Sequence, residues 1–413
     1  MLILRLVVAA ALSMASSFPA PVKVIIGRAP TMAWVPNETA GDHRGGRLLI
    51  VTSCEDYGVC LSTSTDLGAS WDTGNVSAGP GDDGEGRAHA PLHMAGLPFT
   101  FDGGKGFFGI GALVTLPGTQ SLILEFANLT AMHPGGCDDG VLQEYGPMQI
   151  KSTDAGRSWG QLLDVQRQIP SNPAKGCMIP TADASLILRA DGPHPGRLLF
   201  CNVHDSYNGD IITYSDDGGE TYEYSGQLHL PGQDECSLAQ LGNGSLLYIS
   251  RSCNVSGGFS HANCETVRDN DGFSWHSPSL SGPGNHQFSY STSDDGGEHW
   301  SLPLGRLPQT LTPVCQASLT SYKNSVYYSS PFNNWTRVNL TILATAADSG
   351  VEFSRSLNLD PGPAGYSSVL CGLPGAYDCA VAYEGPRVGN ASEGCRGGKC
   401  WVQFIRFAST DVK

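Results

Sequence analysis

The sequence predicts an all-β protein built as a six-bladed β-propeller. The first observation behind this prediction is a short repeat, which reads serine, any residue, aspartate, any residue, glycine, two further residues and an aromatic residue. Four copies occupy residues 64–71, 152–159, 215–222 and 293–300. A fifth copy, residues 346–353, keeps the aspartate, glycine and aromatic residue but has alanine in place of serine. A recurring unit of this kind fixes the architecture.

The residues of this repeat, which we call the Asp-turn, are typical of a tight turn. Its aspartate is expected to accept hydrogen bonds from backbone N–H groups one or two residues further on, and its glycine supplies a positive φ. Its aromatic side chain can fold back beneath the turn. Each copy therefore predicts a hairpin that joins two strands and is held by its own side chains.

The second and third observations are the strand-like runs and the spacing of the repeats. Short or alternating apolar runs are separated by clusters of Gly, Pro, Asn and Asp, which indicate turns. The runs are residues 47–52, 122–126, 185–188, 198–201, 211–214, 246–250, 339–345 and 401–407. The Asp-turns are unequally spaced, which favours four-stranded blades with inserted loops over a regular solenoid.

The N-terminus has the pattern of a secretory signal peptide over residues 1–15. Arg5 precedes a short apolar core, and small residues follow at 13–15. This apolar run is shorter than the ~20 residues that a membrane span needs, and no other stretch is long enough to span. We expect residues 16–413 to form a single propeller domain, secreted or lumenal, including the lysosome as a destination.

The cysteines and glycosylation sequons favour the same compartment. Thirteen cysteines in a secreted chain indicate disulfides, and the odd number leaves one thiol free or paired between chains. Local candidate pairs are Cys54 with Cys60, Cys253 with Cys264, Cys371 with Cys379, and Cys395 with Cys400. Eight N-x-S/T sequons begin at Asn37, Asn75, Asn128, Asn243, Asn254, Asn334, Asn339 and Asn390.

The net charge of the chain disfavours some classes of binding partner. The formal net charge of −15 opposes binding to nucleic acid or to an anionic membrane surface by bulk attraction. An anionic substrate would therefore need a local cationic pocket. No C-x-x-C pair is present and the histidines are scattered, so we expect no metal site.

Four further motifs lie outside the Asp-turns. The first is Gly-Arg-Ala-Pro around Arg28, ahead of the run at 47–52. The second contains Glu235, then a hairpin-like segment, then Arg251. The third places Arg337 before the last Asp-turn, and the fourth contains Gly-Tyr-Ser-Ser around Tyr366 and a later strand that ends in Tyr-Glu at Glu384.

In this order, the motifs resemble those of the exo-α-sialidases, or neuraminidases, a family of six-bladed propellers with Asp-box repeats and a cleft at the central axis. The resemblance covers almost the whole mature chain from about Gly27. The first motif departs from the family's aromatic-Arg-Ile-Pro pattern, because Gly27 and Ala29 replace the aromatic residue and isoleucine.

The resemblance implies that Arg28, Arg251 and Arg337 bind the carboxylate of a sialic acid. Arginine suits this role because its planar fork can bond both carboxylate oxygens and keeps its charge. Glu384 would hold Arg28 through an ion pair.

The resemblance also implies that Tyr366 is the nucleophile and Glu235 its base. Sialidases are an exception among glycosidases in using tyrosine. A neutral phenol avoids repulsion by the sugar carboxylate, but its ordinary pKa of about 10 means that a base must remove its proton.

The general acid is expected in the short loop between Thr52 and Cys60. Without a gap, the family's aspartate falls on Ser53, which cannot donate the proton. With a deletion, Asp56 is the best candidate and Glu55 the next; the alternative is that both are solvated turn residues. The acidic stretch 81–85 could substitute, although the resemblance does not support it. Gln316, in a segment before the third arginine, either lines the cleft or has a backbone role.

The sequence thus predicts a secreted retaining exo-α-sialidase that needs no cofactor and acts on sialylated glycans. One alternative is a catalytically impaired propeller that binds sialylated glycans or a protein partner, and a trans-sialidase is another. Linkage preference and oligomeric state are left open.

Overall fold

The computed structural model describes most of the chain from residue 19 onward. The described residues are 19–37, 45–54, 58–73, 108–128, 147–160, 162–169, 178–204, 210–225, 233–252, 266–267, 274–275, 288–302, 305–307, 309–313, 315–333, 336–347, 351–387, 390–394 and 400–413. The expected signal peptide at 1–15 lies outside them.

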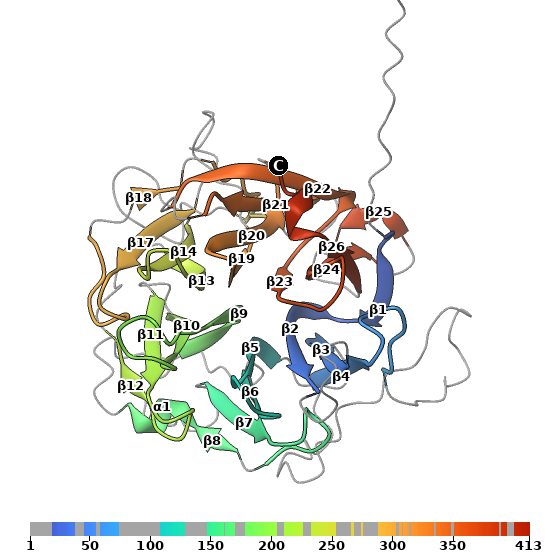
Figure 1. Ribbon diagram of the computed structural model, residues 1–413. Helices are drawn as coiled ribbons and strands as arrows, with labels where there is room; N and C mark the ends of the chain where they lie inside the picture. Colours follow the sequence, from blue (N-terminus) through green and yellow to red (C-terminus); the bar gives the residue numbers. More distant parts are fainter. Residues whose placement is uncertain are drawn as a thin grey trace, which may run out of the picture.

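Six small antiparallel sheets are arranged in a ring, so the predicted six-bladed β-propeller is confirmed (Figure 1). Blades one and two consist of β2 (Arg28–Pro36), β3 (Gly46–Cys54) and β4 (Gly58–Ser64), then β5 (Phe108–Thr115), β6 (Leu122–Asn128), β7 (Met148–Ser152) and β8 (Leu163–Asp164). Blades three and four consist of β9 (Met178–Ile187), β10 (Leu198–His204), β11 (Asp210–Ser215) and β12 (Glu223–Tyr224), then β13 (Gln233–Gln240), β14 (Leu246–Ser252), β17 (Ser289–Ser293) and β18 (Gly305–Arg306).

Blades five and six consist of β19 (Ser318–Tyr322), β20 (Ser325–Pro331), β21 (Val338–Thr345) and β22 (Phe353–Pro363), then β23 (Ser367–Cys371), β24 (Cys379–Arg387), β26 (Cys400–Phe407) and β1 (Val22–Ile26), with β25 (Asn390–Gly394) beside β24. The remaining elements are the ribbon of β15 (Thr266–Val267) and β16 (Ser274–Trp275), the single-turn helix α1 (Val165–Gln168) and the 3₁₀ turn η5 (Ser409–Asp411). Each predicted apolar run falls within one of these strands or overlaps it.

The ring is closed by the two ends of the chain. Strand β1 pairs antiparallel with β26, so that Val22 faces Phe404 and Ile26 faces Trp401. The N-terminal strand is therefore the outermost strand of blade six, whose other strands come from the C-terminal end. Because every blade then has two neighbours, the innermost strands β2, β5, β9, β13, β19 and β23 surround the axis (Figure 1).

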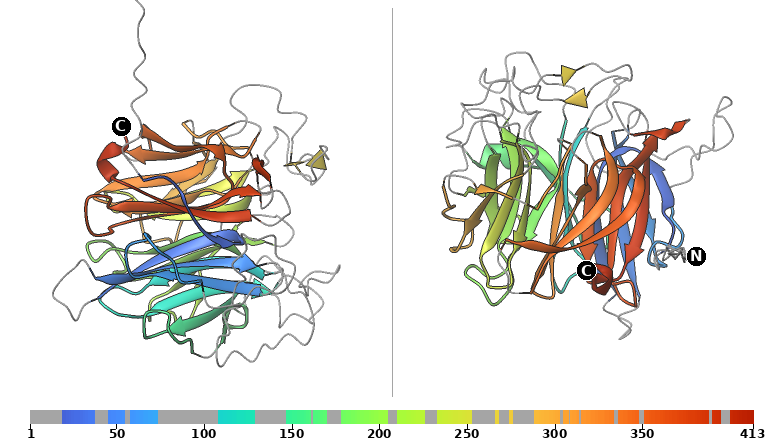
Figure 2. Two further views of the ribbon diagram at one scale, coloured as in Figure 1. Left: turned by 90° about the vertical axis from the view of Figure 1, so that its right-hand side faces the viewer. Right: turned by 90° about the horizontal axis from the view of Figure 1, so that it is seen from above.

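Apolar layers between neighbouring blades form the core. The side views show the sheets packed face to face around the axis (Figure 2). Leu49 of blade one and Leu124 of blade two, both fully buried, belong to one such layer. Burial of a leucine or isoleucine side chain contributes about 1.5–3 kcal/mol. The axial ends of the inner strands are thus held by rigid blades, which is what a precise site requires.

Three of the complete Asp-turns join the third and fourth strands of their blades, which confirms the predicted hairpins; in blade one the turn leads instead to a single antiparallel bridge between Thr63 and Asp72. In each of the four complete copies the serine is the last residue of the third strand. The predicted hydrogen bonds were wrong in register, however. Asp154 Oδ1 accepts from the N–H groups of Arg157 at 2.9 Å and Ser158 at 2.8 Å, three and four residues on. The N–H of Gly156, two residues after Asp154, donates instead to Ser152 Oγ at 2.8 Å, and so does the N–H of Asp154 itself, at 3.3 Å.

The glycines of the Asp-turns bring each turn close to the preceding blade. Gly156 has a φ of +78°, and a Cβ atom on it would lie 2.5 Å from Leu49 of blade one. Gly219 has a φ of +82°, and its Cβ would lie 2.6 Å from Ile123 of blade two. Glycine is therefore needed for both backbone conformation and close approach.

The aromatic residue fills the space beneath the turn, as predicted. Trp300 Nε1 donates to the carbonyl of Gly297 at 3.1 Å and its ring packs edge-on against Tyr248, at 6.0 Å between centroids. In the fifth copy, Phe353 is buried at the start of β22, whereas Asp348 and Gly350 lie outside the described residues.

Two disulfides are present among the described residues. Cys371–Cys379 confirms one predicted local pair, and Cys201–Cys236, which the sequence did not indicate, links β10 of blade three to β13 of blade four. Cys60 and Cys400 are also disulfide-bonded. The side chains of their expected partners, Cys54 and Cys395, lie outside the described residues, as does the pair Cys253 and Cys264. Within the described part Cys315 is a buried free thiol. Nor does this part contain a helix with the length and apolarity of a membrane span.

We predict that Ser215→Ala lowers the free energy of unfolding by about 1–3 kcal/mol, because the buried N–H of Gly219 would lose its acceptor, Ser215 Oγ at 2.8 Å. Urea unfolding monitored by tryptophan fluorescence measures this change. Ser354→Ala, at an exposed position of β22, is the matched control and should change stability by less than ~0.5 kcal/mol. Equal stabilities of the two variants would show that the serine does not support the turn.

Candidate active site

The carboxylate of Glu384 organises one end of the central axis. Glu384 lies on β24 and its side chain is fully buried. Its Oε1 accepts from Arg28 Nε at 3.2 Å and from the backbone N–H of Ala29 at 2.9 Å. Ala29 has a φ of +50°, an unusual conformation for alanine that turns its N–H toward the carboxylate. Arg28, the first residue of β2, is thus fixed across the boundary between blades six and one.

Tyr366 is held by the same glutamate. The N–H of Gly365 donates to the carbonyl of Glu384 at 2.7 Å, and the N–H of Glu384 donates to the carbonyl of Tyr366 at 2.8 Å. The N–H of Tyr366 also faces Glu384 Oε2, at 3.4 Å. A Cβ atom on Gly365 would collide with Glu384 Oε2, so glycine is required here. Tyr366, the residue before β23, is therefore bonded to β24 and held in one defined orientation.

The hydroxyl of Tyr366 points at the β13–β14 hairpin. It donates a hydrogen bond to Glu235 Oε1 of β13. Arg251 of β14 forms an ion pair with the other oxygen, with 2.6 Å between Nη1 and Oε2, and its Nη1 lies 3.5 Å from the Tyr366 hydroxyl. The arginine favours the ionised form of Glu235. The carboxylate is therefore ready to accept the phenolic proton.

Arg28 and Arg337 lie over the ring of Tyr366. Their guanidinium carbons are 5.8 Å and 5.4 Å from the ring centroid. Arg337 precedes β21, and its carbonyl accepts from the N–H of Ala364 at 2.9 Å. The three arginines predicted from sequence therefore converge on one tyrosine.

The electrostatic environment keeps the arginines charged and the phenol neutral. Glu384 is the main cause of the raised pKa of Arg28. For Arg337, burial opposes the charge, yet the pKa is raised because Cys315, Tyr366 and Glu384 favour the cation. Burial, followed by the charge of Glu235, raises the pKa of Tyr366 well above its usual value. Tyr366 is therefore a phenol at rest and needs a base to act as a nucleophile.

Gln316 bonds the backbone next to Tyr366. Its side chain is fully buried; Nε2 donates to the carbonyl of Ala182 at 3.0 Å, and Oε1 accepts from the N–H of Ser367 at 3.0 Å. The sequence left open a place in the cleft and a backbone-turn or strand role, whereas in the structure the Gln316 side chain bonds backbone groups of two other segments. Gln316 joins β9 to the start of β23 across the axis. Its position before a strand gave only a weak signal in the sequence.

The expected general acids, Asp56 and Glu55, lie outside the described residues, and so does the stretch 81–85. The strand ends that flank their loop are described. Ser53 pairs with Arg28, and Cys54 pairs with Gly58. The loop is therefore anchored beside Arg28, the end of the axis where Tyr366 lies.

Two groups of side chains have the proximity of metal ligands among the described residues. One consists of Cys201, Asp210 and Cys236, but its two sulfur atoms are joined in a disulfide. The other consists of Asp295, Glu298 and His299 on an exposed Asp-turn, where Asp295 already bonds the backbone of His299 at 2.9 Å.

No family model matches this sequence. Among solved structures, the Hadza microbial sialidase Hz136 superposes with a TM-score of 0.60 at 18% identity, covering 95% of this chain and 67% of that one. The intramolecular trans-sialidase from Ruminococcus gnavus, in complex with oseltamivir carboxylate, gives 0.60 at 15% identity and covers 95% and 96%. The leech intramolecular trans-sialidase, complexed with 2,7-anhydro-Neu5Ac, gives 0.62 at 15% identity and covers 94% and 69%.

These superpositions extend over nearly the whole chain and agree with the ring of six blades. In fold, the protein resembles the sialidases.

Proposed function

We propose that this protein is a secreted retaining exo-α-sialidase that removes terminal sialic acids from glycoconjugates. The observation that carries the proposal is the hydrogen bond from Tyr366 to Glu235 within a cluster of three arginines. A buried tyrosine that served only as a core residue would need neither an ionised base nor this number of cations.

The arginines account for binding of an acidic sugar. The cluster has three cations, Arg28, Arg251 and Arg337, and two carboxylates, Glu235 and Glu384. These cations gather at one place although the whole chain carries a net charge of −15. Guanidinium groups can bind both oxygens of a sialic acid carboxylate. Because Glu384 clamps Arg28 before substrate arrives, little ordering is needed on binding.

The two-step mechanism follows from the Tyr366–Glu235 pair. Glu235 takes the phenolic proton as Tyr366 Oη bonds to the anomeric carbon and the bond to the aglycone oxygen breaks. A general acid donates a proton to that oxygen. Water then attacks the anomeric carbon, giving its proton to the same acid group, and the proton on Glu235 returns to Tyr366 as the enzyme–sugar bond breaks. Two inversions give net retention.

Asp56 is our first candidate for the general acid and Glu55 the second. Both belong to the loop that joins β3 to β4, whose described ends lie beside Arg28. Ser53, at the position that the family's pattern gives to the acid without a gap, pairs directly with Arg28 and has no acidic proton.

The same position of Ser53 favours an alternative, a catalytically impaired propeller that binds sialylated glycans or a protein partner. Trans-sialidase activity is a further alternative, since two of the superposed structures are those of intramolecular trans-sialidases. Product analysis distinguishes them: hydrolysis releases free sialic acid, transfer to a sugar acceptor gives a new glycoside, and internal attack gives an anhydro sugar.

Secretion and domain organisation are part of the proposal. Residues 1–15 would be removed as a signal peptide, leaving one propeller domain over 16–413. The disulfides Cys201–Cys236 and Cys371–Cys379 support an oxidising compartment, because such bonds are rarely maintained in the cytosol.

We predict that Tyr366→Phe lowers kcat on an aryl sialoside by about a thousandfold or more, since no oxygen remains to attack the sugar. The affinity for free sialic acid should change by less than about threefold, because the arginines remain. Fluorogenic assay and isothermal titration calorimetry measure these quantities. Tyr290→Phe, on β17, the third strand of blade four, is the matched control. Unchanged turnover by Tyr366→Phe would refute the mechanism.

We predict that Asp56→Asn slows hydrolysis of a natural sialoside by roughly 10²–10⁴-fold but affects an aryl sialoside far less, because a phenolic leaving group needs little protonation. Glu55→Gln, tested on both substrates, is the control. The reverse pattern would assign the acid to Glu55, and an unaffected ratio of the two rates in both variants would exclude this loop.

We predict that Arg337→Ala both raises KM and lowers kcat, reducing kcat/KM by roughly 10–100-fold, because a charged hydrogen bond is lost in the ground and transition states. Arg337→Lys should recover only part of the loss, since lysine cannot form the two-pronged contact. Steady-state kinetics on a sialoside tests this. Full recovery by lysine would mean that charge alone, and not the fork geometry, is used.

A further inference from the structure

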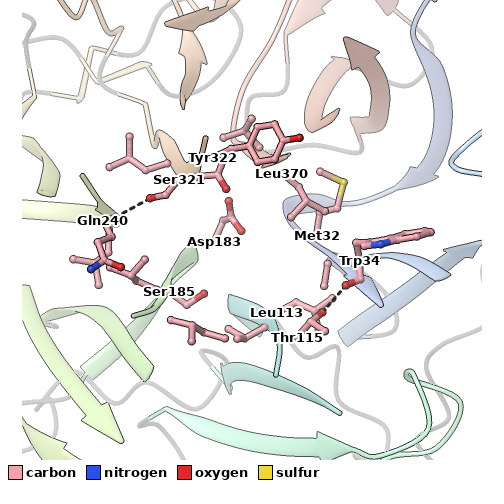
Figure 3. Close-up of a pocket in the computed structure, with 18 of the residues that line it drawn as sticks. Met32, Trp34, Leu113, Thr115, Asp183, Ser185, Gln240, Ser321, Tyr322 and Leu370 are labelled. Carbon is pink, nitrogen blue, oxygen red and sulfur yellow. Dashed lines mark hydrogen bonds between the residues drawn. The ribbon is translucent and has the colours of Figure 1, made fainter. Parts of the chain in front are cut away.

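A cavity lies on the axis toward the other ends of the innermost strands, away from the candidate active site. It has a volume of about 370 Å³ and is lined by residues from β2, β5, β9, β13, β19 and β23, one strand from each blade (Figure 3). On β2 the lining includes Met32 and Trp34, whereas Arg28 begins the strand. Six residues of a strand span about 20 Å. This cavity is therefore separate from the candidate active site.

Asp183 lies in the middle of this ring of strands (Figure 3). It belongs to a bulge of β9, because the pairing with β10 shifts between Phe200 and Asn202. Its φ of +56° lies in the left-handed region, which aspartate adopts more readily than most residues. Its surface is partly accessible although it lies deep in the molecule. The bulge thus presents a carboxyl group to the cavity.

Two hydroxyl groups orient this carboxylate. Thr31 Oγ1 of blade one donates to Oδ1 at 3.4 Å, and Ser318 Oγ of blade five donates to Oδ2. Each hydroxyl oxygen is itself an acceptor: Leu113 N donates to Thr31 at 3.0 Å and Val369 N to Ser318 at 2.9 Å. Their protons are therefore directed at Asp183, which accepts both bonds as a carboxylate would.

Asp183 lacks a cationic partner among the described residues. The two basic residues that line the cavity are engaged elsewhere: Lys323 Nζ pairs with Asp378 at 3.0 Å and Arg189 Nε with Asp191 at 3.3 Å. Burial raises the pKa of Asp183 to about 7. A buried carboxylate without a countercharge is costly, and a cation that entered the cavity would remove that cost.

We propose that this cavity binds a small organic ammonium ion, with the ammonium group at Asp183 and the hydrocarbon part against the partly exposed apolar residues that line it. These include Trp34, Leu186 and Leu370, from three different blades. A volume of about 370 Å³ is in the range of small-molecule sites. A single carboxylate with two hydroxyls is a poor set of ligands for a divalent metal but complements the three donors of a primary ammonium group.

The test compares cyclohexylamine with cyclohexanol, which has nearly the same shape without the charge. Binding to the full-length protein is measured by isothermal titration calorimetry at pH 8, where both Asp183 and the amine are expected to be charged. Cyclohexylamine should bind at least about tenfold more tightly than cyclohexanol, because a charge-assisted hydrogen bond is formed. Equal affinities, or no binding of either compound, would overturn the proposal.

Two variants locate the binding. Asp183→Asn should lower the affinity for cyclohexylamine to that for cyclohexanol. Ser185→Phe fills the cavity from β9 without altering the carboxylate and should abolish binding of both compounds. If Asp183→Asn does not fold, Ser185→Phe alone decides whether the amine binds in this cavity. Tyr366→Phe, at the other end of the axis, should bind both compounds as the wild type does. Binding that persists in Ser185→Phe, or is lost in Tyr366→Phe, would show that the amine does not occupy this cavity.

Discussion

The buried carboxylate of Glu384 is the contact on which the candidate active site depends. It joins blade six to blade one by bonding Arg28 Nε and the N–H of Ala29, and its own backbone is bonded to Gly365 and Tyr366. One side chain thus fixes an arginine and the tyrosine that the arginine flanks. Closure of the ring by β1 and β26 brings these segments together, since Arg28 and Glu384 are 356 residues apart. Without that closure, the arginine would be a solvated cation with no defined position.

Charge at this site is paired between neighbouring segments. Glu384 forms an ion pair with Arg28, and Glu235 forms one with Arg251. Arg251 favours ionised Glu235, the base that we propose for Tyr366. In the proposed mechanism, binding and activation are coupled through Arg251, which contacts both Glu235 and the Tyr366 hydroxyl.

The two ends of the axis have opposite electrostatic character. At one end three arginines surround Tyr366, and one of them, Arg28, begins the inner strand β2. Further along the inner strands, Asp183 presents a carboxylate to the cavity. Gln316 lies between the two regions, since it bonds both Ala182, next to Asp183, and Ser367, next to Tyr366. Strands of a propeller can thus support two sites because only their ends, and not their packed faces, are available for binding.

The sequence by itself determined the fold, the hairpin at each Asp-turn and the residue types of the site, because repeats, turn residues and short motifs are local signals. It was wrong where local geometry is subtle, since the aspartates accept hydrogen bonds three and four residues on. Only the tertiary structure decided which atoms meet. The Cys201–Cys236 bond between blades, the bridge made by Gln316 and the carboxyl of Asp183 at the axis all depend on how the blades pack around the axis. Such contacts join segments that are distant in the chain, and no local pattern records them.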